Sequence, residues 1–417
     1  MVVTTTATTN NFILPGAADD ELFAAIKYLY SLSLDHEPHH DDAYDQHVPG
    51  TGAWFLEGEK YNRWKTERNA NLACVGQMGS GKTVLSSLII EDLRETYPND
   101  TAVLFVYNDI SRSARQSAHI TLVTLFAQAL ERLPHGQASP AILRSLYRHR
   151  QIRPDSVPNK QTIKKDLTSC LGNFDRVFVV VDALDQATDR TYGSEELVKI
   201  LATLKCTTVI TSRLSIPNIG AHYEELQVKA SPEALKLLIT QTLDNGGTLQ
   251  ELLGSDSKFR DTVSQRVLDE ADGIFSVCRC RLDYLRLAQT VADIKSRLEE
   301  APKGLCDLYR RRYAELCEED SSAVRLIYLL IALKDRRMGA RAAMQYLGCS
   351  SWRKTRVTGE ATGSPADHIR SISDVLSTCR GFLILHRAMF SPRAKGTPAS
   401  KSEAAHSIDK NRFARPV

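Results

Sequence analysis

Residues 76–83 read GQMGSGKT, and this stretch decides the fold. It fits the pattern GxxxxGK[ST], in which glycines let backbone N–H groups wrap phosphate oxygens while a lysine and a hydroxyl reach the phosphates and their Mg²⁺. Thr83 is therefore a candidate Mg²⁺ ligand as well. A glycine-rich turn without a ligand is the alternative reading. The candidate nucleotide-binding residues of the loop are Gly76, Gly79, Ser80, Gly81, Lys82, Thr83 and Val84.

The residues on either side of this loop have the context that it requires. Leu72–Val75 is a short apolar run that favours a strand, and 82–96 has apolar residues at helical spacing. A helix that begins at the loop directs its positive dipole end and its first N–H groups toward a phosphate. This order of strand, loop and helix favours a phosphate site over a chance turn.

A second stretch, residues 177–186, reads VFVVVDALDQ. A buried strand that ends in an acid is typical of the Walker B arrangement, so Asp182 is predicted to hold Mg²⁺ through water. Asp185 and Gln186 follow at once and are the candidate catalytic residues beside an attacking water. The alternative is a strand that is capped by an ordinary turn aspartate.

Short β-rich runs alternate with amphipathic stretches from 71 to 229, and the runs read as continuously apolar. This pattern predicts an α/β fold with a parallel sheet and helices on both faces. Arg213 follows the predicted strand 207–211, where it could sense the γ-phosphate, although a surface arginine is the alternative. The predicted strands are 72–75, 101–107, 176–182, 207–211 and 226–229, and the predicted helices are 21–34, 82–96, 119–133 and 194–204. From Ser231, the pattern of a serine N-cap followed by proline predicts helices.

Composition narrows the class of protein. The 417 residues carry a net charge of +3, which requires neither nucleic acid nor an anionic membrane as a partner. The longest apolar run, 326–333, is too short to span a bilayer. Nine scattered cysteines without a CxxC pair indicate free buried thiols and a cytoplasmic protein. The histidine-rich segment 35–47 could bind metal, but a solvated linker is the favoured interpretation.

Together these stretches resemble the NACHT NTPase module of fungal NOD-like receptor proteins, of the nephrocystin 3-like type within the STAND class. NKxD and LSGGQ motifs are absent, which sets GTPases and ABC transporters aside. The resemblance covers residues 49–386 and implies ATP or ADP with Mg²⁺, a nucleotide-dependent switch, and self-association or signalling protein partners. It is carried by GTGAWFL at 50–56, GQMGSGKTVLSSLIIEDL at 76–93, VVVDALD at 179–185, VITSR at 209–213, EADGIF at 270–275, APKGL at 301–305 and CRGFL at 379–383.

Composition, apolar spacing and the resemblance together predict a domain plan. Residues 1–48 are expected to form a disordered or linker N-terminus with a short helix, 49–230 the nucleotide-binding domain, and 231–300 a helical domain. An incomplete winged-helix-like domain at 301–386 and a disordered basic tail at 387–417 follow.

Two departures from the family pattern matter. Gln186 stands where the family usually has an acid, and an amide cannot accept a proton from water, so we expect weak hydrolysis or none. His386 does not fall where the family's winged-helix histidine stands, and the winged helix looks incomplete. Two other functions therefore stay open: a non-catalytic scaffold locked by nucleotide, and a truncated receptor fragment.

Overall fold

The structure is a computed structural model. It describes residues 15–33, 35–97, 101–108, 117–133, 137–186, 193–215, 223–245, 247–254 and 256–300. For 15–19, 193–194 and 300, and for the short segments 384–386 and 412–414, it describes the backbone alone.

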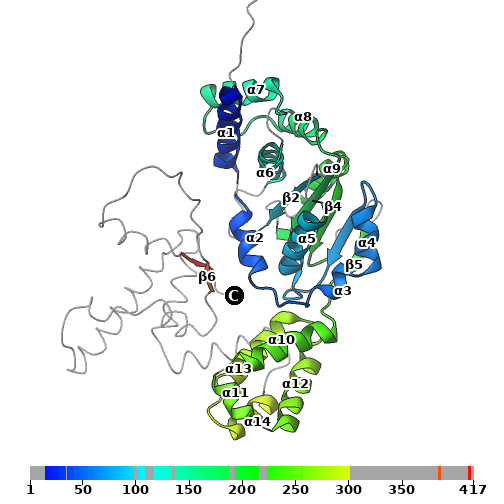
Figure 1. Cartoon of the computed structure of the whole chain (residues 1–417), viewed down its shortest axis with the longest axis vertical. Helices are drawn as coiled ribbons and strands as arrows, with labels where there is room; N and C mark the ends of the chain where they lie inside the picture. Colours follow the sequence, from blue (N-terminus) through cyan, green and yellow to red (C-terminus); the bar gives the residue numbers. More distant parts are fainter. Residues whose placement is uncertain are drawn as a thin grey trace, which may run out of the picture. The chain divides into compact units, whose positions relative to one another are not determined.

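In the described part of the chain, five parallel strands form one sheet in the order β2-β3-β4-β1-β5 (Figure 1). Strand β1, which leads into the loop at 76–83, lies between β4 and β5, and strand β3, which ends at Asp182, lies between β2 and β4. The predicted parallel α/β sheet is confirmed. The strands are β1 (Asn71–Val75), β2 (Thr101–Tyr107), β3 (Arg176–Asp182), β4 (Thr207–Ser212) and β5 (Glu224–Gln227).

Strand β5 begins two residues before its predicted start at 226. Its register pairs Leu72 of β1 with Glu224. Glu224 and Glu225 are exposed, which an edge strand tolerates because part of its surface faces solvent. The apolar pattern alone could not reveal these two residues as strand.

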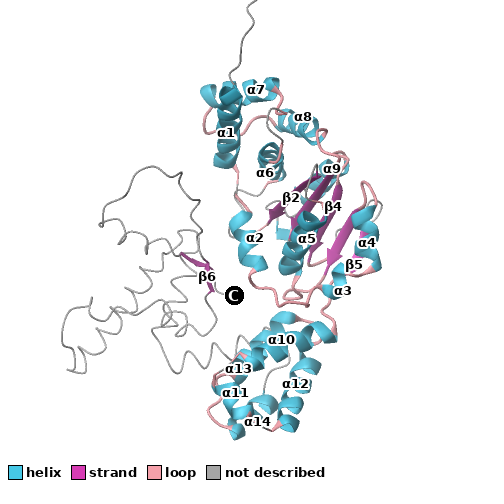
Figure 2. Ribbon diagram, viewed as in Figure 1, coloured by secondary structure: helices cyan, strands magenta, loops and turns pink. Residues whose placement is uncertain are grey.

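Helices cover both faces of the sheet, as Figure 2 lets the reader follow. On one face, Leu104 of β2 lies in a core with Leu122 and Phe126 of α6 (Ala118–Glu131). On the other face, the next residue, Phe105, lies under the guanidinium of Arg94 from α5 (Lys82–Thr96). Successive strand residues point to opposite faces, so both must be apolar. Residues of α7 (Pro140–Ile152), α8 (Lys160–Leu171) and α9 (Gly193–Ala202) belong to the same hydrophobic core as α6.

The N-terminal segment differs from the expected linker. Helix α1 (Pro15–Leu32) begins before the predicted start at 21, and 37–44 forms α2 (Glu37–Tyr44). His36 and His40 are each only 2% exposed, and both form hydrogen bonds with Tyr107, the last residue of β2. No group of residues that could hold a metal ion occurs among the described residues. Two short helices follow, α3 (Ala53–Leu56) and α4 (Glu59–Thr66).

The chain divides into two compact units, with a boundary between Val228 and Lys229. The second unit contains the helices after this boundary, together with residues 41–51 and 79–81. The Ser231 hydroxyl accepts from Ala234 N at 3.1 Å, which confirms the predicted N-cap. The described helices that follow the boundary are α10 (Pro232–Asp244), α11 (Thr248–Leu253), α12 (Ser257–Ala271), α13 (Phe275–Leu285) and α14 (Val291–Glu300).

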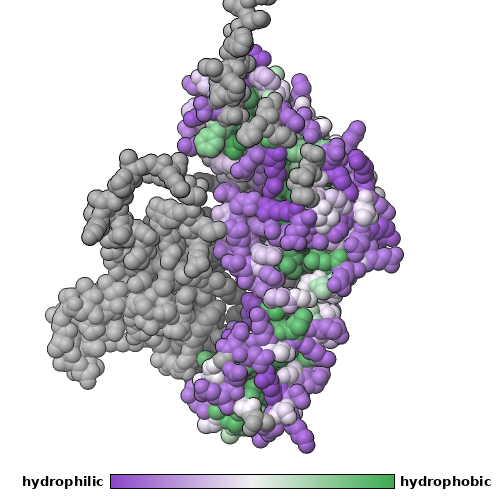
Figure 3. Space-filling model, in the orientation of Figure 1, coloured by the Kyte–Doolittle hydropathy of each residue, from purple (hydrophilic) through white to green (hydrophobic). Residues whose placement is uncertain are grey.

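The winged-helix prediction lies outside the described residues. Within 301–417, the structure describes only β6 (Ile384–His386) and β7 (Arg412–Ala414), which pair antiparallel. The described cysteines are buried, and Cys74, Cys170, Cys206 and Cys278 are free thiols, as predicted for them. Hydrophilic residues cover most of the described surface visible in Figure 3. Of the helices that the structure describes, none has the length and apolar character to cross a membrane.

Candidate functional site

The loop between β1 and α5 has the backbone that its glycines predict. Gly79 and Gly81 have φ angles of +83° and +91°, in the region that residues with a Cβ rarely adopt. Gly76 N donates to Ser212 O at 3.1 Å, which ties the start of the loop to the end of β4. Helix α5 begins at Lys82, so its first N–H groups have no partner within the helix and are suited to phosphate oxygens.

Lys82 is folded onto the loop that precedes it. Its Nζ donates to Gly76 O at 2.7 Å and to Gln77 O at 2.8 Å. Burial lowers the pKa of Lys82 and Arg213 lowers it further, while Asp182 and Asp185 act in the opposite direction. The ammonium thus bonds to neutral carbonyls in a partly desolvated place, where an anionic phosphate would be a stronger acceptor.

The Asp182 carboxylate lies at the end of β3 and is 2% exposed. It accepts three hydroxyl hydrogen bonds: Thr83 Oγ1 donates to Oδ2 at 2.9 Å, Ser86 Oγ to Oδ1 at 2.9 Å, and Thr211 Oγ1 to Oδ1 at 2.7 Å. Hydrogen bonds to a charged group are worth about 1.5–3 kcal/mol each, so this carboxylate is firmly oriented.

Two of these three hydroxyls were missed by the sequence reasoning. Ser86 lies four residues after Lys82, which is one helical turn, so helical spacing could have found it. Thr211 ends the run 207–211, and only the strand order places it beside Asp182. Sequence alone does not reveal that order.

The chain turns sharply after Asp182. Ala183 has a φ of +49°, which costs a non-glycine residue about 1–2 kcal/mol. Ala183 N donates to Thr211 Oγ1 at 2.8 Å, and its carbonyl accepts from Gln186 N at 2.9 Å in the short 3₁₀ helix η2 (Leu184–Gln186). These bonds hold the turn that carries Asp185 and Gln186.

This turn brings Asp185 to Arg213. Arg213 N donates to Asp185 Oδ1 at 3.2 Å, and its Nε lies 3.5 Å from Oδ2. The Arg213 side chain is 39% exposed, so the guanidinium is accessible to solvent. The carboxylate of Asp185 is thus a partner that a ligand anion would have to replace.

The structure therefore brings together Lys82, Thr83, Asp182, Asp185 and Arg213. For the other residues of the predicted site, the contacts described here are made by backbone atoms. Val84 O accepts from Ser87 Oγ at 2.7 Å. Gly79 O accepts from Ser276 N at 3.1 Å, and both residues belong to the second unit.

Asn108 is a further polar residue that sequence reasoning missed. It directly follows β2, next to the Walker B strand, and is 4% exposed. Its backbone N and its Nδ2 both donate to Asp182 O, at 3.2 and 2.9 Å. Its Oδ1 is buried and accepts no hydrogen bond from any residue that the structure describes. No motif predicts it, because its role depends on the pairing of β2 with β3.

The donor set fits a magnesium nucleotide. Thr83 and Asp182 supply the hard oxygens that Mg²⁺ prefers, and they already lie 2.9 Å apart. Left-handed glycines and a lysine at a helix start supply donors for phosphate.

Residues 50–213 match the family model described as Nephrocystin 3, N-terminal. This segment is nephrocystin 3-like. The match covers less than half of the chain and includes both phosphate motifs and Arg213. With the motifs and the strand order, it indicates a P-loop NTPase fold for this segment. None of the curated proteins compared with the chain matches it.

Solved structures similar to the chain include ORC1 of Aeropyrum pernix in complex with DNA, at 15% identity and a TM-score of 0.35, covering 93% of both chains. A Walker-type ATPase of Pyrococcus abyssi has 13% identity and a TM-score of 0.38, covering 79% of this chain and 90% of that one. AMPPCP-bound DnaA from Aquifex aeolicus has 12% identity and a TM-score of 0.29, covering 81% and 89%. With such low TM-scores, the fold assignment does not depend on these three likenesses.

Proposed function

We propose that the nephrocystin 3-like segment binds ATP or ADP with Mg²⁺ and acts as a nucleotide-dependent signalling switch with weak hydrolysis. The observation that carries the proposal is the Asp182 carboxylate, which accepts from the P-loop hydroxyl of Thr83 and from Ser86 and Thr211. A buried acid with this orientation beside a phosphate-binding lysine is suited to a metal-bound phosphate.

The residues of the site have separate tasks in this proposal. Lys82 exchanges the carbonyls of Gly76 and Gln77 for β- and γ-phosphate oxygens, and the loop N–H groups bind the remaining oxygens. Thr83 and Asp182 would hold Mg²⁺, which neutralises phosphate charge when it is bound. Ser86 and Thr211 keep the carboxylate in its orientation.

The switch requires a contact that differs between the two nucleotides, because a ligand shifts an equilibrium only through differential affinity. Arg213 provides such a contact. With a diphosphate its guanidinium stays with Asp185, and a γ-phosphate competes for it. In the family-implied picture, this exchange controls self-association or contact with signalling partners in the cytoplasm, without nucleic acid or membrane.

Gln186 favours a second candidate, a scaffold that is locked by nucleotide and does not hydrolyse it. The amide can orient a water but cannot take its proton. Under the switch proposal, a glutamate at this position can take the proton of the attacking water. Gln186→Glu should therefore raise phosphate release about tenfold or more, since a general base typically contributes roughly 10²–10⁴-fold. Unchanged phosphate release in Gln186→Glu, with unchanged nucleotide affinity, would count against the role of Gln186.

The test of the function measures nucleotide occupancy and turnover together. Nucleotide released from the purified full chain is identified by mass spectrometry, and phosphate release is followed in parallel, with Lys82→Ala as the control. Bound ADP or ATP with slow, Lys82-dependent phosphate release supports the switch. Bound nucleotide without turnover favours the scaffold, and no nucleotide in either protein contradicts both.

A further inference from the structure

The Asn108 side chain presents a buried acceptor with a fixed orientation. Its Nδ2 donates to Asp182 O at 2.9 Å, and rotating the amide by half a turn would place two oxygens against each other. The Oδ1 atom is therefore the one that has no partner among the described residues, and the residue is only 4% exposed. Buried polar groups are nearly always paired, so this exception calls for a ligand.

An amide oxygen only accepts hydrogen bonds, so the ligand must offer a hydrogen-bond donor. Phosphate oxygens of a bound nucleotide carry no hydrogen to donate, so they cannot satisfy Oδ1. A water molecule can. Mg²⁺ keeps several waters in its shell when it binds nucleotide, and ligands of parallel α/β sheets bind beyond the carboxyl ends of the strands, which is where Asn108 lies.

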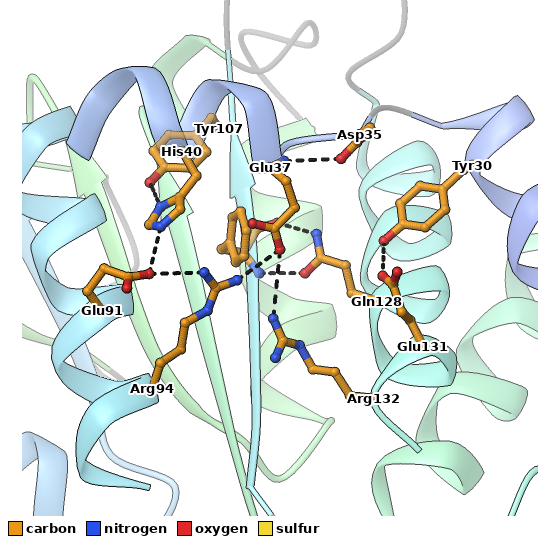
Figure 4. A network of polar contacts seen from close by, with 11 residues as sticks. Tyr30, Asp35, Glu37, His40, Glu91, Arg94, Tyr107, Gln128, Glu131 and Arg132 are labelled. Atoms are coloured by element: carbon orange, nitrogen blue, oxygen red, sulfur yellow. Dashed lines mark hydrogen bonds and ion pairs between the residues drawn. The ribbon is translucent and has the colours of Figure 1, made fainter. Parts of the chain in front are cut away.

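The end of β2 is held in place from the side away from β3. Tyr107 N donates to His36 Nδ1 at 3.3 Å, and the Tyr107 hydroxyl lies 3.0 Å from His40 Nδ1. His40 Nε2 in turn lies 2.8 Å from Glu91 Oε1 (Figure 4). Asn108 directly follows Tyr107, so its amide is fixed between this support and the Asp182 backbone and does not need to reorganise when a ligand arrives.

We propose that Asn108 is a positioning residue of the nucleotide site, and that its Oδ1 accepts a hydrogen bond from a water in the coordination shell of the nucleotide-bound Mg²⁺. This proposal rests on the nucleotide function proposed above. A second source of the same chemistry is the attacking water, which would affect turnover but not equilibrium binding.

The test compares the affinity for a non-hydrolysable ATP analogue with Mg²⁺ and with EDTA, on the full chain. Asn108→Leu removes the acceptor and keeps a side chain of similar branched shape, and Asn108→Ala is the second variant in case the larger leucine does not fit. Asn62→Ala is the matched control, since Asn62 Nδ2 also donates to two backbone carbonyls, at 3.2 and 3.1 Å. Lys82→Ala tests the nucleotide function itself.

The expected result is that Mg²⁺ tightens binding about tenfold less in the Asn108 variants than in the wild type, as the loss of one hydrogen bond predicts. Affinity in EDTA should stay near the wild-type value, and Asn62→Ala should keep the full Mg²⁺ effect. The thermal midpoint of the Asn108 variants should fall by only a few degrees, because they also lose the buried hydrogen bond to Asp182 O. An unchanged Mg²⁺ effect overturns the proposal, even where phosphate release falls. An equal loss with and without Mg²⁺ overturns it too. If the wild type binds no analogue, the function itself fails.

Discussion

Two polar clusters adjoin the same sheet and differ in how their groups are satisfied. The phosphate cluster, at the carboxyl ends of the strands, comprises Lys82, Thr83, Ser86, Asp182, Thr211 and Asn108. The edge network, beside β2, comprises Glu37, His40, Glu91, Arg94, Tyr107 and Arg132 (Figure 4).

In the phosphate cluster, an ammonium is bonded to main-chain carbonyls and a buried amide oxygen accepts nothing. In the edge network, charge meets charge: Arg94 lies 3.0 Å from Glu91 and 2.8 Å from Glu37. The difference indicates that the first cluster is arranged for a ligand and the second for stability. Substitutions in the two clusters should therefore separate nucleotide affinity from the free energy of unfolding.

The largest expected effect on the Mg²⁺ dependence of binding comes from Asp182→Asn. The amide cannot accept three hydroxyl bonds as a carboxylate does and is a weaker Mg²⁺ ligand, so affinity for Mg²⁺-nucleotide should fall about 100-fold, or roughly 2.7 kcal/mol. Isothermal titration with and without Mg²⁺ measures this. Affinity in EDTA should change much less, and an unaltered Mg²⁺ effect would contradict the assignment of Asp182.

The largest expected effect on stability comes from Arg94→Ala. This change removes both ion pairs and the cation–π contact with Phe105, whose centroid lies 5.2 Å from the guanidinium. Because these contacts are partly exposed, the free energy of unfolding should fall by about 2 kcal/mol. Urea unfolding of Arg94→Ala is compared with Lys199→Ala, a 78%-exposed cation whose removal should matter little. Nucleotide affinity of the folded Arg94→Ala protein should remain within about twofold of the wild-type affinity. A much weaker affinity would show that the two clusters are energetically coupled, which contradicts their separation.

Acid should weaken the edge network through Glu91. Burial raises the pKa of Glu91, but hydrogen bonds from His40 and Arg94 outweigh burial, so the pKa lies below the ordinary value of 4.5. The carboxylate therefore contributes stability above about pH 4.5, and that contribution is lost as pH falls through the folded-state pKa. Urea unfolding at pH 7 and well below pH 4 should show Glu91→Gln less stable than the wild type by about 1 kcal/mol at pH 7, and nearly equal to it at the lower pH. A constant difference at all pH values would contradict this interpretation.

The smallest expected effect is that of Ser86→Ala. Asp182 keeps its bonds from Thr83 and Thr211, so affinity for Mg²⁺-nucleotide should fall only about threefold to tenfold. Ser87→Ala is the neighbouring control, because Ser87 Oγ donates to Val84 O instead. Equal losses in the two variants would remove Ser86 from the phosphate cluster.

The sequence predicted much of the phosphate cluster and little of the edge network. Lys82, Thr83 and Asp182 belong to local patterns in which spacing along the chain fixes position in space, so the strand, loop and helix followed from the residues. Ser86 was within reach of helical spacing. The edge network joins α2, α5 and α6 across many residues of chain, and no local pattern marks His40 as the partner of Tyr107.

The error at 35–47 has a physical cause. A segment with four histidines and several acids reads as solvated, because polar residues are mostly exposed. The edge of β2 offers backbone donors and a tyrosine hydroxyl that two of these histidines satisfy. The burial of these histidines could not be predicted from the sequence, because the sequence does not reveal which strand lies at the edge of the sheet. The roles of Asp185, Gln186 and Arg213 remain predictions for experiment.

The most direct test of the central claim is the affinity of a fluorescent ATP analogue with Mg²⁺ for the wild type, Lys82→Ala and Arg94→Ala, at a temperature where all three are folded. We expect micromolar or tighter binding to the wild type and to Arg94→Ala, and at least about 100-fold weaker binding to Lys82→Ala. Equal affinity of the wild type and Lys82→Ala, or no binding to either, would contradict the claim that the loop at 76–83 is a nucleotide site.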